Sequence, residues 1–315
     1  RTFTRVSGIN ANDKLVMIGR EQLKYSRLVI AAGADVIQLP VTRSDESSAG
    51  LSKDRVFSVN DLLDYREIRQ SLEGDQRVVI LGAGLIGCEF ANDLAEVGYQ
   101  VDIVAPCESL LPSLLPPAAG DALQRGLEKT GIHFHLGHVA EQIDHSDNGV
   151  RVSLDNTAVV EADLVLSAVG LLPRKQLAEQ ATIACGKGIR VNRYLETSSK
   201  DIYALGDCAE VEGYSLLYIL PLMASARALA KTLIGQPTPV QYGAMPVTVK
   251  TPACPVIVCP PPEHAEGSWQ CENVSPVDVK ASFTNAEGQL LGFALTGSCT
   301  SEKQTLTKLV PPLFV

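Results

Sequence analysis

The residues with the clearest chemical pattern are three glycines, spaced Gly82-x-Gly84-x-x-Gly87. They lie between an apolar run that predicts a strand, Arg77–Leu81, and a run that predicts a helix, Cys88–Val97. In such a turn the first glycine permits the sharp bend, the second lets a pyrophosphate approach the backbone, and the third lets helix and strand pack closely. The helix N-terminus then holds the phosphates. The pattern predicts a dinucleotide-binding loop, and a turn that serves packing alone is the alternative.

The acidic residue that usually binds the adenosine ribose stands about 20 residues after such a loop, where the second strand ends. Here that place is occupied by Ala105 and Pro106. Asp102 falls inside the expected strand, and Glu108 comes slightly late. No arginine stands there to hold a 2′-phosphate either. The sequence therefore leans only mildly towards NAD and leaves NADP open.

Two carboxylates lie near possible ligand positions. Glu89 follows the third glycine by two residues, and on the first helical turn it would point back towards the loop, beside a nicotinamide or flavin. The alternative, which spacing alone favours, is a glutamate that merely suits the helix dipole. Asp207, in Gly206-Asp207, ends a predicted strand and could accept hydrogen bonds from ribityl or ribose hydroxyls. A helix N-cap is an equal alternative for Asp207.

The cysteines and histidines predict neither redox nor metal chemistry. None of the eight cysteines forms a CxxC pair, which indicates buried free thiols in a reducing compartment. Cys254 and Cys259 have the spacing of a redox pair, but on the extended strand predicted between them they would lie too far apart to bridge. His133 and His135 alternate on one face of a predicted strand. No carboxylate partner is evident in the sequence, so we expect exposed histidines and no metal site.

The bulk composition bounds the remaining possibilities. With 315 residues the chain is long enough for two or three domains. Its formal net charge of −9 argues against a general nucleic-acid binder, which needs a basic face. No run reaches about 18 apolar residues, and no signal peptide opens the chain, so we expect a cytoplasmic protein without a membrane span. Arg1–Ile9 already reads as a strand, so the chain is expected to begin inside a domain.

The order of elements predicts an α/β fold with two interleaved dinucleotide-binding, Rossmann-like domains and a small α+β C-terminal domain. Two apolar runs that each end in glycine, Leu28–Gly33 and Leu164–Gly170, read as buried parallel strands of two related units. A βαβαβ pattern lies between them. We place the first part of one domain at 1–74, the second domain at 75–187, the remainder of the first at 188–244 and the C-terminal domain at 245–315.

Three segments carry a resemblance to a known family. They are Val-Ile-Leu-Gly-Ala-Gly-Leu-Ile-Gly-Cys-Glu-Phe-Ala at 79–91, Ala-Val-Gly-Leu-Leu-Pro-Arg at 168–174, and Ile-Tyr-Ala-Leu-Gly-Asp-Cys-Ala-Glu at 202–210. They resemble the FAD- and NAD(P)-dependent pyridine nucleotide-disulfide oxidoreductases, which have two dinucleotide folds. Further motifs at 60–62, 104–108, 218–224 and 245–255 resemble a branch of that family that reduces rubredoxin. The resemblance covers essentially the whole chain.

The resemblance also implies site residues. FAD would bind in the domain of 1–74 and 188–244, and NADH in that of 75–187. The residues implied for FAD are Val6, Ala31, Ala32, Gly33, Glu89, Gly206, Asp207, Ile219, Leu220 and Lys250. The residues implied for NAD are Gly82, Gly84, Leu85, Ile86, Gly87 and Gly170. No side chain is expected to act as a catalytic acid, base or nucleophile.

The implied activity is electron transfer from NADH through FAD to the acidic carrier rubredoxin, which supplies alkane hydroxylation. One alternative is a related reductase of ferredoxin, flavorubredoxin or a small quinone. Another is a truncated, non-catalytic nucleotide-binding fragment, because family members begin with a further strand, glycine loop and helix that are not found before Arg1. We therefore expect a truncated chain whose flavin domain lacks its first strand and has an open parallel edge.

Overall fold

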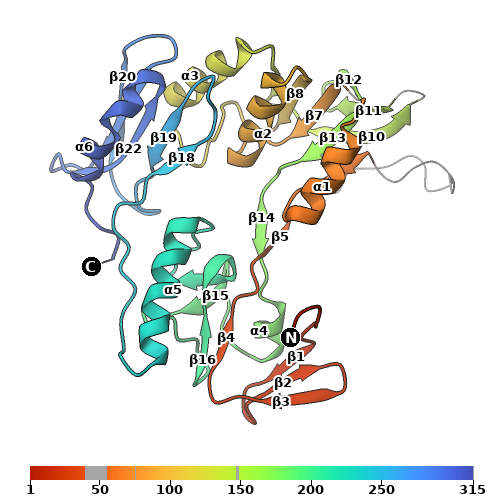
Figure 1. Ribbon diagram of the computed structural model, residues 1–315. Coiled ribbons are helices and arrows are strands. Elements are labelled where there is room, and N and C mark those ends of the chain that lie inside the picture. Colours follow the sequence, from red (N-terminus) through yellow and green to blue (C-terminus); the bar gives the residue numbers. More distant parts are fainter. Residues whose placement is uncertain (40–54, 75, 147–148, 315) are drawn as a thin grey trace. The chain divides into compact units, whose positions relative to one another are not determined.

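The computed structural model describes residues 1–39, 55–74, 76–146 and 149–314 (Figure 1). Its chain divides into two compact units. The first unit comprises Arg1–Asp35, Leu171–Met245 and Pro312–Val315, and the second comprises Val36–Gly170 and Pro246–Pro311. The chain passes from one unit to the other after residues 35, 170, 245 and 311. The domain ends proposed from the sequence, at 74, 187 and 244, stay predictions.

The second unit is built around a five-stranded parallel sheet (Figure 1). Its strands, in spatial order, are β6 (Val56–Phe57), β13 (Leu164–Ser167), β7 (Arg77–Leu81), β8 (Gln100–Ala105) and β9 (His133–Leu136). The helices of this part are α1 (Leu62–Ser71), α2 (Leu85–Glu96) and α3 (Pro117–Glu128). The central strands β13 and β7 are apolar between their ends because both faces of the sheet are covered.

The two faces of this sheet have different partners. One face, through Ile80, Ile103 and Leu164, packs in a core with residues of α2 and α3. The other face, through Val79 and Val165, packs on an antiparallel meander. The strands of the meander are β10 (Ala140–Ser146), β11 (Gly149–Leu154) and β12 (Val159–Ala162). Only one side of each meander strand is buried, and this explains why apolar and polar residues alternate along these strands.

A second, antiparallel sheet completes this unit. Its strands, in spatial order, are β18 (Val247–Val249), β19 (Val256–Cys259), β22 (Leu290–Thr296), β21 (Val279–Thr284) and β20 (Ser268–Asn273), followed in sequence by η2 (Gly297–Glu302) and α6 (Lys303–Thr307). Helix α3 packs against β21 and β22. Gly126 permits a close approach there, because a Cβ at this position would lie 2.4 Å from Cβ of Cys254. One continuous apolar core therefore joins the two sheets.

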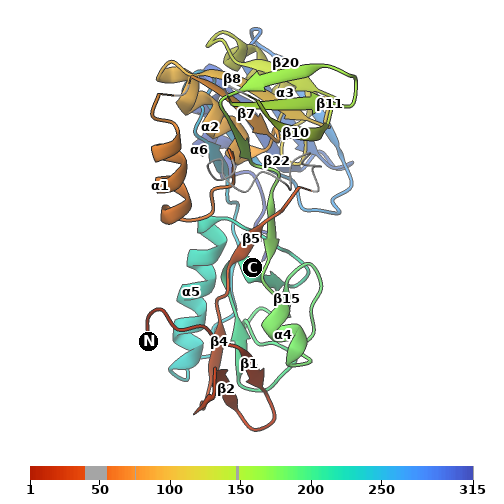
Figure 2. The ribbon, with the colours of Figure 1, turned by 90° about the vertical axis from the view of Figure 1, so that its right-hand side faces the viewer.

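The first unit consists of small sheets around its own core. Its strands are β1 (Gly8–Asn10), β2 (Leu15–Ile18) and β3 (Glu21–Lys24) in a meander, β4 (Leu28–Ile30) parallel to β16 (Ile202–Ala204), β15 (Ile189–Val191) parallel to β17 (Ala209–Val211), and β5 (Ala34–Val36) beside β14 (Leu171–Pro173). Its helices are α4 (Gln176–Gln180), η1 (Gly206–Cys208) and α5 (Ile219–Leu233). Ala228 and Leu229 of α5 are buried in this core. Figure 2 shows the course of α5 in the first unit.

The predicted elements are found, with corrections at their ends. Leu28–Gly33 and Leu164–Gly170 supply the parallel strands β4 and β13, as predicted. Helix α2 begins three residues earlier than predicted, at Leu85, and helices α3 and α5 begin at Pro117 and Ile219. The prolines at 117 and 221 are tolerated because the first turn of a helix needs no N–H donor. The prediction of a strand over Arg1–Ile9 was wrong for residues 1–7, since pairing with β2 begins at Gly8.

A single carboxylate fixes the start of the central strand β7. Asp163 Oδ2 accepts hydrogen bonds from the N–H groups of Gln76 (2.9 Å) and Arg77 (2.8 Å), and its Oδ1 accepts one from the Arg77 guanidinium (2.6 Å). Burial acts to raise the pKa of Asp163, but the guanidinium and the two N–H donors outweigh it and hold the pKa below its usual 3.8. Asp163 thus joins the entry to β13 with that to β7.

We expect Asp163→Ala to destabilise the second unit by about 2 kcal/mol, because two backbone N–H groups and a guanidinium lose their acceptor. The folded-state pKa is depressed, so this stabilisation is complete above the unfolded-state pKa and is lost as the pH falls through the folded-state value. Urea denaturation followed by circular dichroism should therefore show a difference between variant and wild type that shrinks below pH about 4.

Glu161→Gln is the matched control, because Glu161 forms an exposed ion pair with Arg151. Its unfolding free energy should change by less than about 0.5 kcal/mol. Equal effects of the two substitutions would contradict the anchoring role of Asp163.

Candidate functional site

The three glycines of the 82–87 turn meet three different demands. Gly82 has φ +112°, and a Cβ there would lie 2.6 Å from the carbonyl oxygen of Ala168. A Cβ on Gly87 would lie 2.1 Å from the carbonyl oxygen of Gly82, so helix and turn can pack only without it. A Cβ on Gly84 would meet nothing within 4 Å. The turn is therefore closed at its first and third glycines and open at the second, as a pyrophosphate loop requires.

Helix α2 directs its N-terminus at this open position. Gly84 is its N-cap, and the Cys88 N–H donates to the Gly84 carbonyl over 3.0 Å. No side chain caps the helix, and its first turn contains no acidic residue. Leu85 and Ile86, predicted to lie in the loop, form the first helical turn. Their N–H groups and the helix dipole favour an anion at Gly84.

Gly170 lies at the end of the chain segment that follows β13. It has φ +115°, and its carbonyl accepts a hydrogen bond from the Ile37 N–H over 3.0 Å. Since β13 and β7 are neighbours in the parallel sheet, Gly170 and the glycine turn both follow the carboxyl ends of adjacent strands. Ligands bind at this edge of open α/β sheets.

Glu89 and Lys250, which lie far apart in sequence, are in direct contact. A Glu89 carboxylate oxygen accepts a hydrogen bond from the Lys250 backbone N–H over 2.7 Å. Glu89 lies in the second turn of α2, so the prediction that it belongs to the first turn was wrong, because the helix begins at Leu85. The carboxylate fixes the chain just after β18 and leaves the exposed Lys250 ammonium free of this contact.

Asn92 makes a second contact of the same kind, and sequence reasoning missed it. Its side chain is buried, and Oδ1 accepts a hydrogen bond from the Ala253 N–H over 3.1 Å. Asn92 stands one helical turn after Glu89, on the same face of α2. The spacing of these two polar residues, three apart on a predicted helix, was the available signal. Together the two side chains hold residues 250–253 against the helix that carries the glycine loop.

In the first unit, residues 31–33 follow β4 and are held by an arginine. Gly33 has φ +73°. The Arg174 guanidinium donates to the Ala32 carbonyl (3.1 Å) and to the Asp35 carboxylate (2.6 Å), while its N–H donates to the Gly33 carbonyl (2.9 Å). Arg174 belongs to the 168–174 motif but was not predicted as a site residue. It fixes the conformation of the 31–35 segment.

Asp207 lies in η1, directly after β16. It is half-buried, and within the described chain its carboxylate has no donor partner; burial raises the pKa of this carboxyl above its ordinary value. The N-cap alternative is wrong, because the N-cap of η1 is Leu205 and that of α5 is Tyr218. An unpaired, half-buried carboxylate fits a ligand that brings its own donors, such as the hydroxyls of a sugar or ribityl chain.

The remaining predicted site residues of the first unit lie on two separate segments. Val6 precedes β1 and is half-buried. Ile219 and Leu220 open α5 and are exposed, at 71% and 54%. Large apolar side chains at the start of a helix, left in solvent, are suited to cover a planar aromatic ligand.

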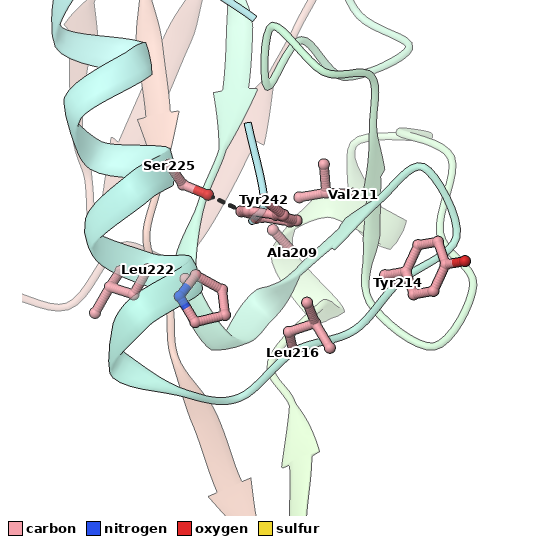
Figure 3. A pocket seen from close by; sticks show the side chains of 9 residues that line it. Ala209, Val211, Tyr214, Leu216, Leu222, Ser225 and Tyr242 are labelled. Atoms are coloured by element: carbon pink, nitrogen blue, oxygen red, sulfur yellow. Dashed lines mark hydrogen bonds between the residues drawn. The ribbon is translucent and has the colours of Figure 1, made fainter. Parts of the chain in front are cut away.

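A pocket of the first unit lies beside Gly206 (Figure 3). Its lining comprises Gly206, Ala209, Val211, Tyr214, Leu216, Pro221, Leu222, Ser225 and Tyr242. The hydroxyls of Ser225 and Tyr242 share a hydrogen bond of 2.9 Å across it. Because Gly206 is the only predicted site residue that lines it, the pocket does not by itself mark a binding site.

The cysteines and histidines were expected to carry neither redox nor metal chemistry. None of the eight cysteines, all of which are described, forms a disulfide, and Cys254 and Cys259 are both buried. Among described residues no group of three or more possible metal ligands is found. His135 nevertheless has a carboxylate partner, contrary to expectation: its Nε2 lies 2.8 Å from Oδ1 of Asp102. The two strands β8 and β9 are neighbours, which local sequence could not reveal.

In the described residues no helix is long and apolar enough to cross a membrane.

Comparison with known proteins identifies related chains. The family model described as "Pyridine nucleotide-disulphide oxidoreductase" matches residues 2–231, and "Rubredoxin binding C-terminal domain" matches residues 239–310. A rubredoxin-NAD(+) reductase of Alcanivorax borkumensis is 50% identical over 315 residues, which are 100% of this chain and 80% of that protein. One from Acinetobacter baylyi is 45% identical over 96% of this chain and 76% of its own length. A ferredoxin reductase from Rhodopseudomonas palustris superposes with a TM-score of 0.82 at 25% identity, covering 93% of this chain and 72% of the other.

The glycine turn generates a paired prediction. Gly84→Ala should fold with a melting temperature within about 2 °C of the wild type, since its methyl group meets nothing. It should weaken NAD+ binding about tenfold or more, because the methyl group stands where phosphate approaches. Gly87→Ala should instead destabilise the protein by about 1–3 kcal/mol through its clash with Gly82. Calorimetry of unfolding and of NAD+ binding separates the two effects, and unchanged NAD+ affinity in Gly84→Ala would refute the loop assignment.

Proposed function

Since the chain belongs to the pyridine nucleotide-disulphide oxidoreductase family, we propose that it is an NADH-dependent flavoenzyme that reduces rubredoxin. The observation that carries the proposal is the combination of a complete dinucleotide loop at 82–87 with a C-terminal region that matches a rubredoxin-binding domain. The similarity to rubredoxin-NAD(+) reductases extends over both regions.

NADH would bind at the carboxyl edge of the parallel sheet in the second unit. Gly82, Gly84 and Gly87 shape the turn, and the first N–H groups of α2, at Leu85 and Ile86, face the phosphates. Gly170, beside the neighbouring strand end, would bound the same edge. The protein thereby supplies position and a favourable field for the dinucleotide.

In the first unit, FAD would be held by Val6, the 31–33 segment fixed by Arg174, the Gly206-Asp207 turn, Ile219 and Leu220. Glu89 and Lys250 belong to the second unit, and the family resemblance alone assigns them to FAD. Asp207 supports the assignment, because its carboxylate has no partner in the described chain and would accept hydrogen bonds from flavin hydroxyls. When bound, FAD would accept a hydride and release electrons singly, which a nicotinamide cannot do alone.

No side chain is assigned an acid, base or nucleophile. The chain's residues orient the reactants and set the charge around them. Glu89 accepts the Lys250 N–H and so fixes the backbone from which the ammonium extends. That positive charge would favour the electron density gained on reduction and would steer an acidic carrier.

We further propose that the electrons supply an alkane hydroxylation and that the protein works in the cytoplasm. Eight cysteines of which none is in a disulfide suit a reducing compartment.

The proposal is tested first by the visible spectrum of the purified chain reconstituted with FAD. A flavin band that bleaches on adding NADH, and returns when oxidised rubredoxin is added, is expected. Ferredoxin and flavorubredoxin serve as comparison acceptors and should be reduced at least about tenfold more slowly, given the preference for one partner. Failure to bind FAD, or bleaching without electron transfer to rubredoxin, would overturn the proposal.

Asp207→Asn separates the flavin role of this carboxylate from a structural one. Burial raises the pKa of Asp207 in the folded protein, so the charged form costs stability, and the flavin-free variant should be no less stable than the wild type at pH 7. Its affinity for FAD should fall about tenfold. In the wild type, FAD binding should weaken as the pH falls through this raised pKa. Equilibrium dialysis measures the affinity, and Glu212→Gln, an exposed carboxylate of the same unit, is the control.

Lys250→Ala removes the ammonium but keeps the N–H that Glu89 accepts. We expect a lower flavin reduction potential and, at low salt, rubredoxin reduction slowed about three- to tenfold. The effect on rate should fade as salt screens the charge. Lys129→Ala, which removes another exposed lysine of this unit, should leave both unchanged. Spectroelectrochemistry and stopped-flow mixing give the two readouts, and wild-type values for both would contradict the role of Lys250.

A further inference from the structure

The segment that follows β8 is held by a backbone hydrogen bond at each end. At one end the Leu111 N–H donates to the Ala83 carbonyl over 2.9 Å. At the other end the Gly137 N–H, just after β9, donates to the Cys107 carbonyl over 3.1 Å. Residues 107–111 are thus pinned between the glycine turn and the end of the neighbouring strand.

Leu111 shows that this arrangement has a conformational cost. It is a buried leucine with φ +48°, a left-handed conformation that β-carbon sterics disfavour by about 1 kcal/mol or more. The conformation aims its N–H at Ala83, inside the glycine turn. The surrounding core, in which Leu111 is 1% exposed, maintains it. Strain of this kind is retained where a segment has to take one position.

Within the pinned segment one carboxylate faces the sheet edge. Glu108 is exposed, and its side chain lies over Gly137, where a Cβ would stand 2.9 Å from Oε1. Gly137 has φ +75° and no side chain, so the carboxylate can lie between the ends of β8 and β9. Among described residues Glu108 has no ion-pair partner. The ribose of a dinucleotide held by the loop lies at the end of the second strand, here β8.

The other candidates for binding a ribose are excluded one by one. Asp102 is inside β8, and its carboxylate is bonded to His135 over 2.8 Å. Ala105 and Pro106 have no polar side chain. Cys107 packs against the apolar core. Over residues 105–116 the sequence contains no lysine or arginine, so a 2′-phosphate would find no counter-charge and would meet the Glu108 carboxylate.

We infer that Glu108 binds the 2′-hydroxyl of the adenosine ribose and selects NADH over NADPH. Glu108 stands three residues past the end of β8. The hydrogen bonds that hold residues 107–111 bring its carboxylate back to the edge of the sheet. This inference rests on the proposed function and assigns a specificity-determining residue to its nucleotide site.

Glu108→Ala should raise the dissociation constant for NAD+ and the KM for NADH by about tenfold, as expected for a lost charge-assisted hydrogen bond. It should also lower the ratio of the KM for NADPH to that for NADH. Glu108→Gln, which keeps an acceptor but removes the charge, should improve NADPH with a smaller loss for NADH. Asp102→Asn, which changes the carboxylate bonded to His135, should leave the nucleotide preference unchanged.

A 2′-deoxyadenosine analogue of NAD+ makes the test specific for the hydroxyl. The wild type should bind the analogue about as weakly as Glu108→Ala binds NAD+, and Glu108→Ala should bind both forms alike. Calorimetry gives these constants without turnover. If Glu108→Ala weakens the analogue and NAD+ equally, or leaves NAD+ affinity unchanged, the inference is overturned. Rubredoxin reduction by the wild type at saturating NADH tests the proposed function separately, so either can fail alone.

Discussion

The close crossing of α2 over β7 is the constraint on which the second unit depends. It exists because Gly87 has no side chain, so that the helix can begin against the carbonyl of Gly82. From that start follow the N-terminal N–H groups at Gly84 and the reach of Glu89 and Asn92 to Lys250 and Ala253. A methyl group added at Gly87 would push the helix away from the turn. The nucleotide site and the contacts with the C-terminal region would then move together.

Much of the fold could be predicted from the sequence because its signals are local. The apolar run of β7 and the glycine spacing each report on a few neighbouring residues. The helix ends were predicted less well. The positions 85–87 serve both turn and helix, and the prolines at 117 and 221 mark first turns rather than breaks. The strand expected over residues 1–9 is only Gly8–Asn10 in the structure, because a strand needs a partner and the ladder with β2 begins at Gly8.

The candidate site was predictable only where its residues share a motif. The partnership of Glu89 with Lys250 spans 161 residues, and that of Asp102 with His135 depends on which strands are neighbours. Neither can be derived from spacing. Arg174 was visible within a motif, yet its hold on the 31–35 segment depends on the folded first unit. Local pattern therefore indicated the type of ligand, while tertiary structure supplied the side chains that position it.

The continuous core of the second unit has a consequence for how such proteins diversify. Val249, Val256, Ala281 and Ala294 of the C-terminal sheet are buried with residues of α2 and α3, and Cys254 is seated against Gly126. The C-terminal region is therefore not a detachable module. Exchanging residues 246–311 between relatives would expose or overfill an interior surface, so inheritance of a new electron acceptor is easier through substitutions on the outer surface than through recombination at the boundary.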